Sequence, residues 1–64
     1  MNKVTIVIPN YNGEQWLRGC LNSVAPSFQN AAITYDIIVV DDASTDKSRE
    51  IVTSEYPDVK LISL

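Results

Sequence analysis

The chain contains no histidine and only one cysteine, Cys20. A single cysteine cannot form an intramolecular disulfide, and without a second cysteine or a histidine the usual zinc ligand sets are excluded. A lone cysteine fits a reducing compartment, so we expect a cytoplasmic protein. A chain of 64 residues builds one small core, which rarely supplies more than about 3–5 kcal/mol of stability without such reinforcement. Partner subunits therefore remain as the expected source of additional stability.

Positive charge, glycine and long apolar runs are also scarce. Five basic against eight acidic residues argue against a nucleic-acid partner, which needs a clustered basic patch. The two glycines, Gly13 and Gly19, cannot form a glycine-rich phosphate loop or a G-x-G-x-x-G turn, which argues against a dinucleotide-binding protein. The first apolar run, Val4–Ile8, ends at Pro9 and is too short for a signal-peptide core or a membrane span.

Three apolar segments are predicted to be strands: Val4–Ile8, Ile37–Val40 and Val59–Leu64. The first two are nearly continuous and rich in β-branched residues, which is typical of parallel strands that are covered on both faces. The third alternates with polar residues, which indicates a more exposed strand.

A helical pattern lies between the first two strands. Asn12 is expected to cap the amino end of this helix, with Gln15 completing a capping box, and Pro26 is expected to end it. Trp16 and Cys20 belong to its apolar stripe, which predicts that both side chains pack in the core.

A second helical pattern follows the second strand, and the segment Ser27–Tyr35, which has no clear period, is predicted to be a loop. Ser44 and Asp46 are cap formers, and Ile51 and Val52 can face the sheet. The element order is therefore β-α-β-α-β, one half of a Rossmann-like, doubly wound α/β domain. Such a half has a three-stranded parallel sheet in the order 3-2-1, which leaves the first strand with an open side.

Polar side chains follow the first two strands, where ligands of open parallel sheets bind. Pro9, Asn10 and Tyr11 follow one strand, and Asp41 and Asp42 follow the other. A tyrosine ring can stack on a nucleobase, and the carboxylate of Asp42 can accept the imide N–H of uracil or thymine. An alternative stays open at this point: the aspartates only cap the next helix, and Tyr11 is partly buried filler.

Both motifs resemble those of family 2 (GT-A fold) inverting glycosyltransferases. Val4–Asn12 is similar to the opening strand of that family, which ends in Pro-x-Tyr-Asn, and Tyr35–Asp46 is similar to its second strand and Asp-Asp-Gly-Ser-x-Asp turn. The helix between them also fits. The resemblance extends over residues 1–64, and it implies an amino-terminal, partial GT-A nucleotide-binding subdomain of a longer enzyme.

The resemblance implies a site for a UDP- or dTDP-sugar donor, in which the positions matching Tyr11 and Asp42 contact the base. The full set of matching positions is Pro9, Asn10, Tyr11 and Asp42, with Asp41, more variable in the family, at the base site or as a rim or cap residue. Ser44 and Asp46 look like helix caps rather than ligands. Ala43 replaces the usual glycine, which predicts a turn without positive φ.

The family's catalytic parts are expected beyond Leu64. They are the Asp-x-Asp motif, which holds Mg²⁺ or Mn²⁺ on the diphosphate, and a later Asp or Glu that acts as catalytic base. The intact enzyme is thus expected to bind a divalent cation that this segment does not bind, and to transfer a sugar to an acceptor hydroxyl with inversion. The segment itself is expected to be inactive. Attachment of the parent enzyme to the cytoplasmic membrane face is left open.

Two other hypotheses compete with a donor site. The exposed edge of the first strand could pair with a second copy, which would make the chain a non-catalytic, homodimeric assembly module. Asp41 and Asp42 could instead bind Mg²⁺ as in response regulators. The order of motifs argues against this last hypothesis, because the acidic pair of those proteins follows the first strand.

Overall fold

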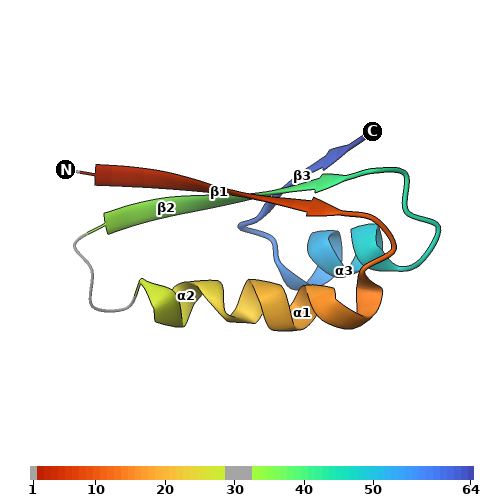
Figure 1. The fold of residues 1–64 in the computed structure, drawn as a ribbon, viewed down its shortest axis with the longest axis horizontal. Coiled ribbons are helices and arrows are strands. Elements are labelled where there is room, and N and C mark those ends of the chain that lie inside the picture. Colours follow the sequence, from red (N-terminus) through yellow and green to blue (C-terminus); the bar gives the residue numbers. More distant parts are fainter. Residues whose placement is uncertain (1, 29–32) are drawn as a thin grey trace.

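The computed structural model describes residues 2–28 and 33–64, which form a three-stranded sheet and three helices (Figure 1). Their order along the chain is β1 (Asn2–Asn10), α1 (Glu14–Asn22), α2 (Val24–Ser27), β2 (Ile33–Asp41), α3 (Ser48–Glu55) and β3 (Lys60–Ser63). The predicted α/β class is confirmed.

All three strands are parallel and lie in the order β1-β2-β3, with β2 in the centre. The predicted order, 3-2-1, names the same neighbours counted from the other edge. The register pairs Ile6 with Ile37, and Asn10 with Asp41, so β1 and β2 end at the same level. This alignment places the two segments that follow the strands next to each other.

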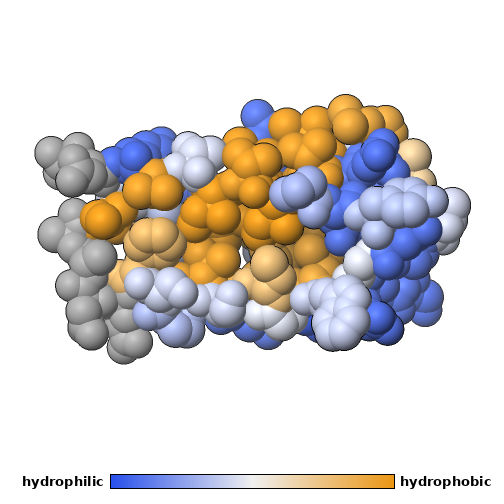
Figure 2. All heavy atoms as spheres, viewed as in Figure 1, coloured by the Kyte–Doolittle hydropathy of each residue, from blue (hydrophilic) through white to orange (hydrophobic). Residues whose placement is uncertain are grey.

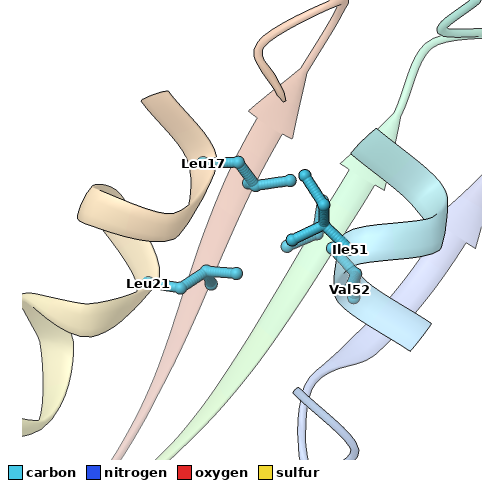
Figure 3. Packing of buried hydrophobic residues seen from close by; sticks show 5 residues of the cluster. Leu17, Leu21, Ile51 and Val52 are labelled. Atoms are coloured by element: carbon cyan, nitrogen blue, oxygen red, sulfur yellow. The ribbon is translucent and has the colours of Figure 1, made fainter. Parts of the chain in front are cut away.

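The helices lie on one face of the sheet (Figure 1). Leu17 and Leu21 of α1 point toward Ile51 and Val52 of α3 above the strands (Figure 3), and Val39 of β2 completes this buried cluster. Two right-handed crossovers that step in the same direction put their helices on the same face. Within the described residues, the expected cover on both faces is therefore wrong.

The uncovered sheet face carries apolar side chains. Val7 is 57% exposed and Ile62 is 38% exposed. In Figure 2 apolar residues continue over the sheet, whereas hydrophilic residues gather at the end where β1 and β2 finish.

The ends of the first helical segment differ from the prediction. Gly13, not Asn12, occupies the N-cap position, and no side chain there makes a capping hydrogen bond. Pro26 lies inside α2 rather than ending a helix, because it stands in the first turn of α2, where no intrahelical N–H is needed. Strand β2 begins at Ile33, so the end of the predicted loop Ser27–Tyr35 is strand, while residues 29–32 of that loop lie outside the described residues.

Trp16 and Cys20 do not belong to the core. Trp16 is 71% exposed and Cys20 is also exposed. Leu17 and Leu21, the next residue in each case, are 2% and 4% exposed. Each residue of a helix is rotated by about 100° from the last, so the helix can bury the leucine row only by turning the Trp16–Cys20 row to its flank.

Candidate functional site

The carboxyl ends of β1 and β2 form one rim. Asp42 N donates a hydrogen bond of 2.9 Å to the Asn10 carbonyl, which continues the ladder between the strands. Leu64 N donates one of 2.9 Å to the Asp41 carbonyl, so the end of the chain lies at the same rim. This pairing places Tyr11 near Asp41 and Asp42, as the sequence analysis predicted.

Asp41 is buried at the base of this rim, with 0% of its surface exposed. Its Oδ1 accepts hydrogen bonds from Asn10 Nδ2 (3.0 Å) and Ser44 Oγ (2.6 Å), and its Oδ2 accepts one from Ser44 N (2.9 Å). Arg49 Nε lies 3.8 Å from Oδ2. Burial alone would raise the pKa of Asp41, but the bonds from Ser44 and Asn10 outweigh it and hold the pKa below its ordinary value.

These contacts make Asp41 an anchor for the turn that follows β2. Both carboxylate oxygens are occupied by protein donors. Direct contact between Asp41 and a ligand stays a prediction, and this burial does not favour it.

Tyr11 and Asp42, by contrast, face solvent. Tyr11 is 66% exposed and Asp42 is exposed as well. A hollow of about 400 Å³ lies between them, and its lining consists of Pro9, Asn10, Tyr11, Val40, Asp42 and Leu64. Four of the predicted site residues thus line one hollow.

Val40 and Leu64 are the lining residues that the sequence analysis missed. Val40 pairs with Pro9 in the register of β1 and β2. Since paired residues of parallel strands point to the same face, the register would have found Val40. Leu64 has no such signal, because its place depends on how far β3 extends.

The turn after β2 is strained where the sequence predicted an ordinary turn. Ala43 has a φ of 54°, in the left-handed region. The expectation that Ala43 needs no positive φ is therefore wrong. Left-handed backbone costs a residue with a β-carbon about 1–2 kcal/mol, and the bonds that Asp41 receives from Ser44 on the far side of Ala43 offset this cost.

Ser44 and Asp46, the two residues expected to cap α3, make different contacts. Asp46 Oδ1 accepts a hydrogen bond of 2.9 Å from Ser48 N at the start of α3, as a cap does. Hydrogen bonding to Ser48 lowers the pKa of Asp46. Ser44 does not cap α3: it is buried, and its hydroxyl bridges Asp41 and the Asn12 backbone.

The divalent cation that the family resemblance implies has no ligand set in residues 2–28 and 33–64, where no three acidic or cysteine side chains are grouped as a metal site requires. Over the same ranges, no helix is long and apolar enough to cross a membrane.

A larger hollow, of about 460 Å³, lies toward the amino ends of β2 and β3. Two of its carboxylates are already paired. Asp36 lies 3.0 Å from Lys3 Nζ, and Glu55 lies 2.6 Å from Arg18, an ion pair that lowers the pKa of Glu55. Its position away from the carboxyl ends of the strands makes it a weaker candidate than the hollow beside Tyr11.

Comparisons with known proteins identify the family to which the chain is similar. Residues 5–64 match the family model described as glycosyl transferase family 2. The chain is 36% identical to the teichoic acid poly(glycerol phosphate) polymerase of Staphylococcus epidermidis, over 91% of the chain and 8% of that protein. It is also 36% identical to the undecaprenyl-phosphate 4-deoxy-4-formamido-L-arabinose transferase of Photorhabdus laumondii, over 100% of the chain and 20% of that protein.

The chain is also similar to a solved structure. The crystal structure of S. aureus TarS residues 1–349 in complex with UDP matches 100% of the chain and 19% of that protein, with a TM-score of 0.73 and 34% identity. The chain therefore spans a fifth or less of the length of these relatives.

Proposed function

Because this chain belongs to glycosyl transferase family 2, we propose that the hollow between Tyr11 and Asp42 binds the uracil or thymine base of a nucleotide-sugar donor. The observation that carries the proposal is the exposure of these two side chains on one hollow, while the neighbouring Asp41 is buried. The similarity to a structure solved with UDP supports a uridine nucleotide.

The chemistry of the hollow suits such a base. Tyr11 offers a ring for stacking, which contributes about 1–3 kcal/mol per base in nucleic-acid binders. The Asp42 carboxylate can accept the N3–H of uracil or thymine and repels an acceptor at that position. Val40 and Leu64 add apolar surface beside the ring.

The remaining steps belong to a longer protein. We propose that it transfers the sugar to an acceptor hydroxyl with inversion, with a divalent cation and a catalytic base supplied by segments beyond Leu64, and that these 64 residues alone do not turn over. The proposal is supported by the share of its relatives that the chain spans, 8% and 20% of two glycosyltransferase relatives and 19% of the solved structure. The cytoplasmic location expected from the single cysteine stays a prediction.

Replacement of Asp42 by alanine is expected to weaken UDP binding at least about tenfold, because it removes a charged hydrogen-bond acceptor for N3–H. The measurement is a titration with UDP and dTDP followed by amide NMR shifts, which we expect to centre on Tyr11 and Asp42. Asp58→Ala, which removes another exposed carboxylate, is the control and should bind like the unchanged chain. Equal binding by the Asp42 and Asp58 variants would contradict the proposal.

A second proposal concerns assembly. In the described sheet, β1 pairs with β2 and is an edge strand, and its Val7 is 57% exposed. An unpaired apolar edge is a template for another strand, so we propose that two β1 edges pair in a homodimer.

The dimer is expected to appear as concentration-dependent sedimentation in analytical ultracentrifugation. Val7→Lys should weaken it, because a lysine on an edge strand opposes pairing with another strand. Thr53→Lys makes the same charge change on exposed α3 and should leave it intact. A monomer at millimolar concentration would rule the dimer out.

A further inference from the structure

The two loops at the rim are joined by a set of hydrogen bonds centred on Asn12. Asn12 N donates to Ser44 Oγ at 2.9 Å, and Asn12 Oδ1 accepts from Thr45 N at 2.8 Å and from Asp46 N at 3.3 Å. We call Asn12, Ser44, Thr45 and Asp46 the cross-loop cluster. It connects residues that are 32 to 34 positions apart in the chain.

A second pair of bonds runs alongside the cross-loop cluster. Glu14 N donates to Asp46 Oδ2 at 3.0 Å, and Lys47 N donates to Glu14 Oε1 at 2.9 Å. Side chains from each loop therefore bind the backbone of the other. Such reciprocal contacts fix the distance between two backbones more firmly than contacts between side-chain tips do.

Tyr11 and Asp42 lie at the edges of this cluster. Tyr11 directly precedes Asn12, and Asp42 lies two residues before Ser44. Asn12 and Ala43 both have left-handed backbone, with φ of 50° and 54°. The described residues offer the side chains of Tyr11 and Asp42 no hydrogen bond, so the backbone of the two loops sets their separation.

We propose that Asn12 is a positioning residue that sets the separation of the Tyr11 ring and the Asp42 carboxylate, and through it the preference for uracil over cytosine. The inference rests on the base site proposed above. The N3 atom of uracil donates a hydrogen bond, whereas the N3 atom of cytosine accepts one. The Asp42 carboxylate discriminates between uracil and cytosine only while it stays in line with N3, because a hydrogen bond weakens steeply as its angle falls.

Position 12 has two requirements, which substitutions can separate. The left-handed backbone suits asparagine, aspartate or glycine. The bonds to Thr45 and Asp46 require a side-chain acceptor, which aspartate has and glycine lacks. Asn12→Gly therefore removes the side-chain bonds to Thr45 and Asp46 at a compatible backbone and keeps the N–H that donates to Ser44 Oγ, whereas Asn12→Asp keeps both features.

The test compares uridine and cytidine binding to the 64-residue chain by NMR titration. Both nucleosides are uncharged, so the charge added by Asn12→Asp meets no phosphate. Asn12→Gly is expected to lower uridine affinity about tenfold and to lower the uridine-to-cytidine preference by a similar factor. Asn12→Asp is expected to keep both within about threefold of the unchanged chain.

The ratio of uridine to cytidine affinity distinguishes a positioning role from a merely structural one, because a general loosening of the site weakens the binding of both nucleosides equally. An unchanged preference in folded Asn12→Gly, or a loss of preference in Asn12→Asp equal to that in Asn12→Gly, overturns the inference and leaves the base site standing. If the unchanged chain binds no uridine, the proposed function falls and the inference with it. If Asn12→Gly loses its dispersed amide spectrum, Asn12→Ser takes its place, because the shorter serine side chain cannot span the distance that Asn12 Oδ1 spans to Thr45 N. It is expected to lower the uridine-to-cytidine preference, and an unchanged preference there overturns the inference.

Discussion

We expect most molecules of the Asp41→Ala variant to be unfolded at room temperature. The substitution removes the acceptor of Asn10 Nδ2, Ser44 N and Ser44 Oγ, all within 3.0 Å of the carboxylate. Hydrogen bonds to a charged group contribute about 1.5–3 kcal/mol each, and loss of one partner leaves buried donors unsatisfied. The expected loss, about 3–5 kcal/mol, equals the whole stability that a core of this size commonly supplies.

Urea unfolding followed by circular dichroism measures this loss. Asp36→Ala is the matched control, because it removes a carboxylate from the same strand whose ion pair with Lys3 is exposed on both sides. Exposed pairs contribute about 0–1 kcal/mol, so the control should keep nearly all of its stability. If the two variants unfold at the same urea concentration, Asp41 does not anchor the rim.

The different places of Asp41 and Asp42 show how far the sequence predicts this site. Adjacent residues at a strand end point to opposite faces of the sheet, so one member of the pair had to face the helices. Both strands are continuous apolar runs, which do not indicate the covered face. The sequence therefore placed the pair at the rim correctly, but it did not separate the buried anchor from the exposed side chain.

The backbone at the rim was less predictable. Alanine rarely adopts left-handed backbone, so the identity of Ala43 pointed away from its φ of 54°. Asparagine is a residue type that favours helix caps, but the side chain of Asn12 binds the loop that follows β2, 33 and 34 positions along the chain. Local propensity cannot predict either feature, because tertiary contacts determine both. The strands and the main helices were predictable, because their apolar patterns are local.

The second prediction with a large effect compares the stability cost of truncating two neighbouring side chains of α1. Leu17→Ala is expected to cost about 2–5 kcal/mol, because it opens a cavity among Leu21, Ile51 and Val52. Trp16→Ala, one position earlier, removes a larger side chain that is 71% exposed. We expect Trp16→Ala to cost no more than about 1 kcal/mol, as is usual for a surface position. Urea unfolding of both variants checks the order.

The comparison tests the rotation of α1 about its axis, which the apolar pattern leaves undecided. Residue size and apolar character would rank Trp16 above Leu17. Burial ranks them the other way, because the cost of truncation depends on the cavity left behind and not on the volume removed. A Trp16→Ala chain as unstable as Leu17→Ala would mean that α1 turns its Trp16–Cys20 row toward the sheet. Asn12, which leads into this helix, would then approach the loop after β2 from another direction, and the cross-loop cluster would not form as described.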